Sequence, residues 1–147
     1  MIKSIVVGTD GSDTAAQAVR EAVDMASAVG ATLGLVSAYA PASEQRLRAE
    51  RRDAPGELQW AMDPRRQVEA SLADAAELAR EAGVEVTTHA CEGDPADAIL
   101  GVAEEREADL VIVGNKGMTG AKRFLLGSVP DKVSHHAPCS VLIVRTT

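Results

Sequence analysis

The hydrophobic pattern of the chain alternates between short apolar runs and longer helical stripes. Residues 5–7 and 110–113 are continuous, mostly β-branched runs, which are typical of strands buried on both faces. With three further segments, the predicted strands cover residues 5–8, 32–39, 84–90, 110–113 and 140–144. Apolar residues at helical spacing predict helices over residues 15–26, 67–82, 95–106 and 128–135. Strands that alternate with helices predict an α/β fold, with an open parallel sheet and helices on both faces.

One stretch, residues 40–66, fits neither pattern. It is rich in arginine and interrupted by Pro41, Pro55 and Pro64. A connection this long is either a functional lid or a disordered segment, and the sequence leaves both open. It follows the carboxyl end of the second strand, where ligands bind in such sheets. The 147 residues otherwise suit a single domain over 1–147.

Composition excludes several classes of function. A net charge of −7 and 2% aromatic residues count against nucleic acid as a partner. No apolar run is long enough to cross a bilayer and no signal peptide is visible, so we expect a cytoplasmic protein. Cys91 and Cys139 lack the spacing of a zinc or redox motif, and we expect them to be reduced, small core residues.

The loop after the fourth strand carries the candidate chemistry. It reads GNKGMTGAKRFLLGS from Gly114 to Ser128. Glycine at 114 and 117 lets the main chain take positive φ and approach a phosphate closely. Gly127 and Ser128 would then present free amides at a helix N-terminus, which favours an anion. The alternative is a solvated loop with capping glycines.

Charge supports the anion hypothesis. Residues 114–136 hold four cations against the single anion Asp131, in an otherwise acidic chain. These cations are Lys116, Lys122, Arg123 and Lys132. Neither GxxxxGK[ST] nor GxGxxG occurs, so a nucleotide hypothesis rests on this loop.

The glycine spacing, the opening VVGTDGS at 6–12 and the closing PCSVLIV at 138–144 together resemble the ATP-binding branch of the universal stress protein family. The resemblance covers the chain apart from residues 40–66. It implies a five-stranded parallel sheet of order 3-2-1-4-5, Rossmann-like and similar to the adenine nucleotide alpha hydrolases. It also implies a homodimer paired through the last strand. An apolar strand at 141–144 would otherwise be an open edge.

The same resemblance implies an ATP site. Asp10 would meet the adenine, and Thr9 and Ala38 would line the base pocket, with Asp10 as a simple turn residue being the alternative. Ribose and phosphates would lie along Val113, Gly114, Lys116, Gly117, Gly127, Ser128 and Val129. Gly8 and Asn115 belong to the same set of expected nucleotide-binding residues. Asn115 and Lys116 depart from members with serine and then histidine or arginine there, and Lys116 would act as a mobile point charge on phosphate. Pro130 replaces a hydroxyl found in some members.

Several functions remain open on the sequence alone. The first is a dimeric, ATP-dependent regulator of the stress response, with Mg²⁺ or Mn²⁺ brought in by the phosphates. Cyclic AMP is a rival ligand. A slow ATPase or phosphotransferase and a nucleotide-free dimeric interaction protein are also compatible with the sequence. We identify no catalytic or metal-binding residue: His135 and His136 are expected to be a surface or helix-end pair, and His89 a structural residue without an obvious partner.

Overall fold

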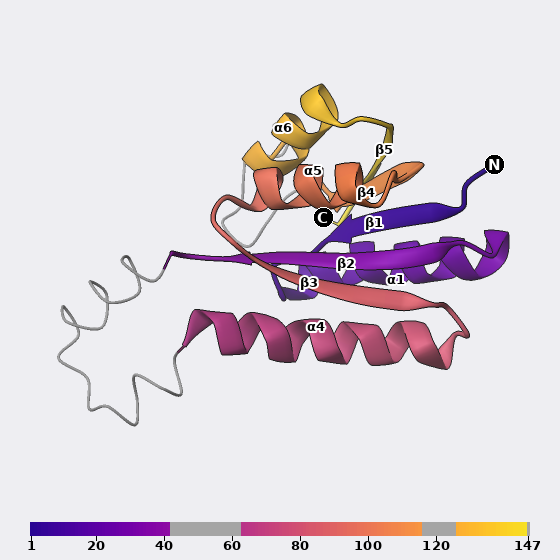
Figure 1. The fold of residues 1–147 in the computed structure, drawn as a ribbon, viewed down its shortest axis with the longest axis horizontal. Coiled ribbons are helices and arrows are strands. Elements are labelled where there is room, and N and C mark those ends of the chain that lie inside the picture. The colour runs from indigo at the N-terminus through magenta and orange to yellow at the C-terminus, as the bar shows by residue number, and fades with distance from the viewer. Residues whose placement is uncertain (42–62, 116–125, 147) are drawn as a thin grey trace, which may run out of the picture.

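The computed structural model describes residues 1–41, 63–115 and 126–146. Strands and helices alternate along these residues (Figure 1). The order is β1 (Ser4–Gly8), α1 (Asp13–Val29), β2 (Thr32–Tyr39), α4 (Pro64–Glu81), β3 (Val86–Glu92), α5 (Pro95–Glu105), β4 (Leu110–Gly114), α6 (Ser128–His136) and β5 (Ser140–Val144). None of the described helices is long and apolar enough to cross a membrane.

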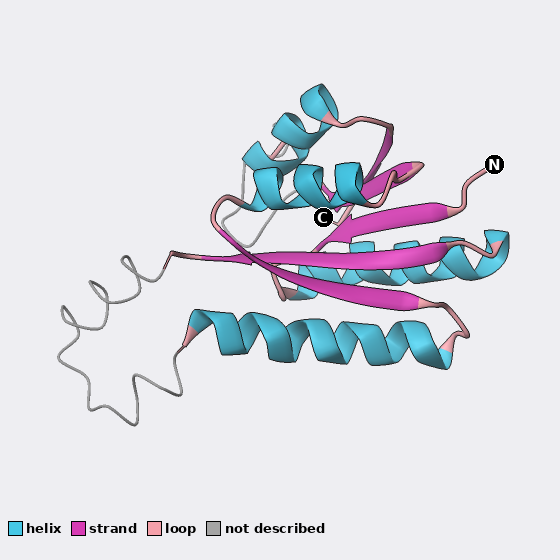
Figure 2. Ribbon diagram, in the orientation of Figure 1, coloured by secondary structure: helices cyan, strands magenta, loops and turns pink. Residues whose placement is uncertain are grey.

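The strands form one parallel sheet of order β3-β2-β1-β4-β5, as expected (Figure 2). β1 is central: Val6 is in register with Gly34 of β2 and with Val111 of β4. Because the strands are parallel, their carboxyl ends all lie at the same end of the sheet, and a ligand site is expected at that end.

Helices cover both faces of the sheet, with α1 and α4 on one side and α5 and α6 on the other (Figure 1). A hydrophobic core lies on each face of the sheet. Because side chains alternate along a strand, β1 contributes residues to both cores. Ile5 and Val7 pack toward α1 and α4, and Val6 packs toward α5 and α6. All three are 0% exposed, which explains the continuous apolar run in the sequence.

Helix starts are set by capping side chains. Ser12 Oγ accepts a hydrogen bond from the amide of Ala15 at 3.1 Å, and Asp94 caps α5 as its Asp-Pro sequence predicts. α4 has the same start, because Asp63 accepts from the amide of Arg65 at 3.1 Å and Pro64 follows it. The predicted start at residue 67 is therefore wrong, and residues 64–66 are the first turn of α4. Residues 42–62 of the expected lid lie outside the described residues.

β3 begins two residues later than predicted. The amide of Val84 donates to the carbonyl of Ala79 at 3.0 Å, so Val84 closes the C-terminal end of α4. Gly83, with φ of +75°, makes this turn possible. Val84 is apolar because it is buried under the helix end, at 5% exposure, and not because it belongs to the strand.

The two edges of the sheet differ in polarity. On β3, Thr87 is exposed and accepts a hydrogen bond from Arg106 Nη1 at 2.7 Å. Arg106 lies across Gly34, where a Cβ would come within 3.0 Å of Nε. The prediction that His89 lacks a partner is wrong, since its Nε2 lies 2.9 Å from Thr87 Oγ1. Burial and the charge of Arg106 lower the pKa of His89. At the opposite edge, β5 exposes 37% of Ile143.

Candidate functional site

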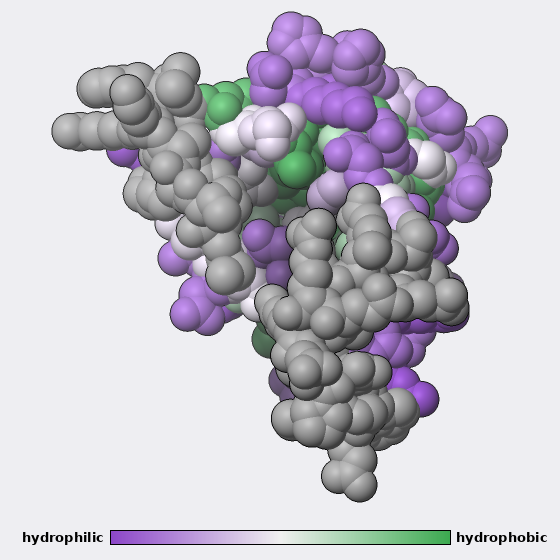
Figure 3. All heavy atoms as spheres, turned by 90° about the vertical axis from the view of Figure 1, so that its left-hand side faces the viewer, coloured by the Kyte–Doolittle hydropathy of each residue, from purple (hydrophilic) through white to green (hydrophobic). Residues whose placement is uncertain are grey.

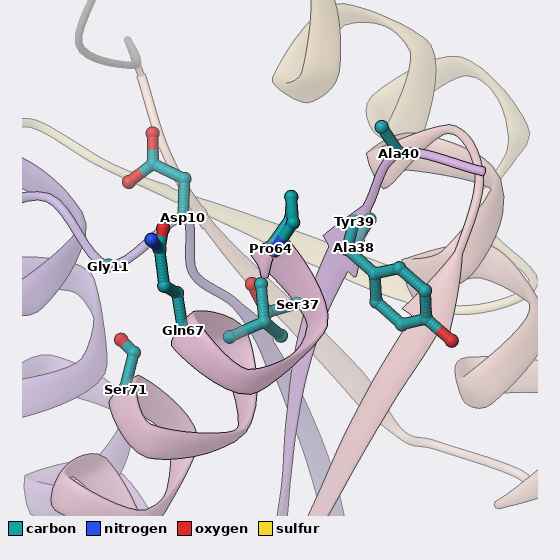
Figure 4. Close-up of a pocket in the computed structure, with 10 residues that line it drawn as sticks. Asp10, Gly11, Ser37, Ala38, Tyr39, Ala40, Pro64, Gln67 and Ser71 are labelled. Atoms are coloured by element: carbon teal, nitrogen blue, oxygen red, sulfur yellow. The ribbon is translucent and has the colours of Figure 1, made fainter. Parts of the chain in front are cut away.

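A pocket of about 380 Å³ opens at the carboxyl ends of β1 and β2 (Figure 4). Three segments line it: the turn after β1, the end of β2 and the first two turns of α4. Its lining residues are Asp10, Gly11, Ser37, Ala38, Tyr39, Ala40, Pro64, Gln67, Val68 and Ser71. Asp10 and Ala38, which we expected at an adenine base, thus lie in one pocket although they are far apart in the sequence. Small-molecule sites commonly have volumes of about 300–1,000 Å³.

The turn after β1 is held by its own side chains. Thr9 Oγ1 accepts from the amide of Gly11 at 3.1 Å, and Asp10 Oδ1 accepts from the amide of Ser12 at 2.9 Å. Gly11 has φ of +80°, which a glycine adopts without strain. Asp10 is therefore both a turn residue and an exposed wall of the pocket, so the two interpretations of this residue are compatible. Thr9 supports the turn from outside the lining.

Contacts at both ends of its first two turns fix α4 against the pocket. The Arg65 guanidinium lies over the ring of Tyr39, 5.9 Å from its centroid, and Arg65 Nε bonds Glu69 Oε1 at 3.1 Å. One turn further on, Ser71 packs against Gly11 so closely that a Cβ there would lie 2.9 Å from Ser71 Oγ. The α4 wall of the pocket is thus set by the same turn that presents Asp10.

The candidate phosphate region lies at the start of α6, beside the end of β4. The amide of Gly127 donates to the carbonyl of Asn115 at 3.0 Å, which brings the two ends of the intervening loop together. The prediction of a free amide at Gly127 is therefore wrong. The amides of Ser128 and Val129 have no acceptor in the described part of the chain, and Pro130 has no N–H. Two amides and the exposed Ser128 hydroxyl remain at this helix N-terminus for an anion.

Asn115 forms hydrogen bonds with residues near the C-terminal end of the chain. Its amide donates to the carbonyl of Val144 at 2.9 Å. Its side-chain Oδ1 accepts from the amide of Thr146 at 2.8 Å and from Thr146 Oγ1 at 2.9 Å. Asn115 therefore joins the candidate phosphate region to the residues after β5, a role that the sequence did not reveal. Lys116 and Gly117, predicted beside it, lie outside the described residues.

Lys132 does not point its charge at the candidate phosphate region. Its Nζ lies 2.8 Å from Asp97 Oδ1 and 3.3 Å from Asp94 Oδ2, both at the start of α5. These partners raise the pKa of Lys132, and the amide of Asp97 is the main cause of a lowered pKa at Asp94. Counting Lys132 among the phosphate-directed cations was therefore wrong.

Seen from the end where the strands finish, hydrophilic side chains gather over α5 and α6 (Figure 3).

The model of the universal stress protein family matches residues 1–145 of this sequence. The chain belongs to the universal stress protein family. The universal stress protein Rv1636 of Mycobacterium tuberculosis is 40% identical over 146 residues, which cover 99% of this chain and 97% of the relative. The universal stress protein MJ0531 of Methanocaldococcus jannaschii is 32% identical, over 99% of this chain and 83% of the relative.

Solved structures of other universal stress proteins share the fold. A crystal structure of a universal stress protein in complex with cAMP is 33% identical, with a TM-score of 0.74, and covers 99% of this chain and 98% of that one. The universal stress protein UspA of Lactobacillus plantarum has a TM-score of 0.80 at 24% identity, over 98% of both chains, which supports the sheet order and the helix layers.

Some predicted residues of this universal stress protein serve packing. A Cβ on Gly8 would overlap Ile99 Cδ1, so the glycine lets α5 lie against the end of β1. Val113 buries its side chain, at 2% exposure, in the core under α5 and α6, and Val129 packs against the same core. Gly114 ends β4 in register with Val144. These positions can offer a ligand their main chain but not their side chains.

The lining residues Ser37, Tyr39, Gln67 and Ser71 were not predicted. A signal for two of them exists in the sequence: the apolar stripe of α4 includes Val68, Leu72, Ala76 and Ala79, and polar residues lie directly beside it at 67 and 71. Cys91 and Cys139 are free and partly buried, as expected, and burial raises the pKa of both thiols. Neither cysteine is among the residues that line the pocket.

Proposed function

We propose that this universal stress protein binds ATP across the ends of β1, β2 and β4 and acts as a dimeric, nucleotide-dependent regulator in the stress response. The adenine would occupy the pocket beside Asp10 and Ala38. The observation that carries the proposal is this pocket, because it joins the two residues expected at the base and lies at the carboxyl edge of a doubly wound sheet.

The phosphates would lie at the N-terminus of α6. The amides of Ser128 and Val129, which have no acceptor among the described residues, and the positive end of the helix dipole support an anion there. Lys116 and Gly117 would add a mobile cation and a close main-chain approach, on the evidence of the sequence. A divalent cation such as Mg²⁺ would come with the phosphates and be held mainly by them and by water.

Cyclic AMP is the second candidate ligand. It is supported by the similarity to a universal stress protein crystallised with cAMP, at 33% identity over nearly the whole chain. Cyclic AMP carries one phosphate, and the two amides and one hydroxyl at the start of α6 form a small anion site that would suit it. ATP would need further donors from the loop that contains Lys116.

Parallel calorimetric titrations with ATP, ADP and cyclic AMP test the proposal, on protein stripped of copurified nucleotide. We expect ATP to bind most tightly and Gly117→Val to weaken the binding of ATP more than that of cyclic AMP, because in this proposal the loop would contact the outer phosphates. If cyclic AMP binds more tightly than ATP and ADP, then cyclic AMP and not ATP is the ligand. Failure of all three to bind would leave the nucleotide-free interaction protein.

Turnover of ATP would be slow. Phosphoryl transfer needs a group that orients the nucleophile beside the γ-phosphate, and the sequence offers no clear candidate. The rate of phosphate release from ATP, measured for wild-type protein and for Gly117→Val, tests this. If the protein is an enzyme, the wild-type rate must exceed that of the variant.

Dimerisation would use β5, whose outer edge has no strand partner among the described residues. Ile143, exposed to 37%, would be covered by the second copy. Sedimentation at micromolar concentration should show a dimer, and Ile143→Lys should give monomers. A wild-type protein that sediments as a monomer would contradict this part of the proposal.

A further inference from the structure

We propose that Gln67 and Ser37 select adenine over other nucleobases by hydrogen bonding to the base from the α4 side of the pocket. The inference rests on the proposed function and adds to it the residues that recognise the base. Neither residue belongs to the set that the family resemblance implied.

Ser37 is the first observation. It is 6% exposed, one of two buried polar residues in the described part of the chain, and it lines the pocket. The other, Thr146, bonds Asn115, whereas the Ser37 hydroxyl has no hydrogen-bond partner among the described residues. Its oxygen is not among the fully occluded side-chain atoms, so it opens onto the pocket. A hydroxyl that opens onto a pocket and is not used by the protein is available to donate to, or accept from, a ligand.

The pair of polar side chains beside the buried stripe of α4 is the second, independent observation. Leu72, Ala76 and Ala79 on the inner face of α4 are buried in the core. The apolar stripe continues through Val68, which also lines the pocket. Gln67 and Ser71 lie beside this stripe, one helical turn apart, and give the pocket hydrogen-bonding groups next to its apolar wall. Figure 4 shows the side chains of Gln67 and Ser71 rising from α4 on the side of Asp10.

The chemistry of these groups fits adenine. A glutamine amide has one acceptor and two donors, and it pairs with the adenine 6-amino group and the adjacent N7. Guanine offers two acceptors at the same positions, so it cannot accept and donate there as adenine does. The Ser37 hydroxyl, which can rotate, would donate to a ring nitrogen.

The α4 wall holds these groups in place before a ligand arrives. Arg65 lies over Tyr39 at one end of this segment and Ser71 packs on Gly11 at the other. Gln67 lies between these two contacts along the helix. A polar group positioned on a fixed helix costs less entropy to order on binding than one on a free loop.

A ligand-and-mutant cycle tests the inference. Wild-type protein and Gln67→Leu are titrated with ATP, with GTP and with purine riboside triphosphate, which lacks only the 6-amino group. We expect wild-type protein to prefer ATP over the amino-free analogue by about tenfold, as one bidentate pair supplies. In Gln67→Leu the affinity for ATP should fall by about tenfold while that for the analogue changes by less than about twofold. Gln17→Leu, the same replacement on the exposed face of α1, is the matched control.

Ser37→Ala gives a second readout that a structural role would not produce. We expect the affinity for ATP to fall by about fivefold, the loss of one neutral hydrogen bond. The thermal midpoint without nucleotide should stay level or rise, because no protein partner is lost. Ser27→Ala is the contrasting control, because its exposed hydroxyl donates to the carbonyl of Ala82 at 3.4 Å: it should leave the affinity for ATP unchanged and should not raise the thermal midpoint.

The outcomes separate the two proposals. Wild-type protein that binds no adenine nucleotide refutes both. Wild-type protein that binds ATP, with Gln67→Leu keeping the wild-type ratio between ATP and the analogue, refutes only the role of Gln67. A Ser37→Ala variant that loses stability but keeps its ATP affinity shows that Ser37 is structural and refutes its part.

Discussion

Replacing Asn115 by alanine tests whether one side chain ties the start of the candidate phosphate loop to the end of the chain. The replacement removes the Oδ1 acceptor of two hydrogen bonds, from the amide and the hydroxyl of Thr146, at 2.8 and 2.9 Å. Thr146 is 7% exposed, so water does not readily replace the lost acceptor. The main-chain bonds of Asn115 to Val144 and Gly127 should survive the change.

The expected cost follows from the bonds removed. Each neutral hydrogen bond contributes about 0.5–1.5 kcal/mol net, and leaving its buried partner unpaired moves the cost toward the upper end. Asn115→Ala should therefore lower the free energy of unfolding by about 2–3 kcal/mol. Thr146→Val removes only the hydroxyl donor and should cost about 1 kcal/mol. For a chain of this size, about 2 kcal/mol corresponds to roughly 4–8 °C in the thermal midpoint.

Urea unfolding of the single and double variants, followed by circular dichroism, measures these differences. Because both changes remove the same hydroxyl bond, Thr146→Val should cost almost nothing in the Asn115→Ala background. Thr88→Val, at an exposed position on β3, provides the matched control for the threonine replacement. An Asn115→Ala protein within about 0.5 kcal/mol of wild type at an unchanged m value would refute the reasoning, as would strictly additive costs.

Three further predictions concern charge and close packing. The main-chain amides of Lys3 and Ser4 donate to Asp109 Oδ2 and lower the pKa of this carboxyl group. The contribution of Asp109 to stability is therefore complete above the ordinary pKa of about 4, and it is lost as the pH falls through the lower pKa of the folded state. The difference in thermal midpoint between wild type and Asp109→Ala should thus be constant from about pH 5 to 8 and shrink below about pH 4, and an unchanged difference at pH 2 would contradict this. Gly8→Ala should destabilise the fold by about 1–3 kcal/mol in chemical unfolding and be partly rescued by Ile99→Val, whereas a variant as stable as wild type would show that α5 moves freely. Lys132→Met should change the ATP affinity by less than about twofold in calorimetry, since the ammonium faces the carboxylates of α5, and a tenfold loss would return Lys132 to the phosphate site.

The sequence pattern predicted the parts of the fold that depend on local signals. β1 and β4 are buried on both faces, so each is a continuous apolar run in the sequence. Ser12 and Asp94 indicate the starts of α1 and α5, because their side chains cap these helices. The start of α4 carried the same Asp-Pro signal at 63–64, and the surrounding prolines and arginines masked it. Val84 was assigned to a strand because apolar character alone does not distinguish a strand residue from one buried under a helix end.

The candidate site was predictable only where one segment held the signal. Asp10 and Ala38 came from a motif, and the structure places both in the pocket. The side-chain partner of Asn115 lies 31 residues away in sequence, those of Lys132 lie 35 or more residues away, and no local pattern specifies such pairings. Gln67 enters the pocket only because α4 packs beside β2, which is a property of the tertiary arrangement.

The difference between the two edge strands would limit how many copies the proposed β5 contact can join. The β3 margin is rich in hydroxyls and crossed by a guanidinium, whereas the β5 margin exposes isoleucine. Two chains that meet along β5 about a twofold axis each cover the other's apolar margin, and the outer margins that remain are hydrated. In the proposed dimer, growth through this contact would therefore stop at two chains and could not continue into a filament.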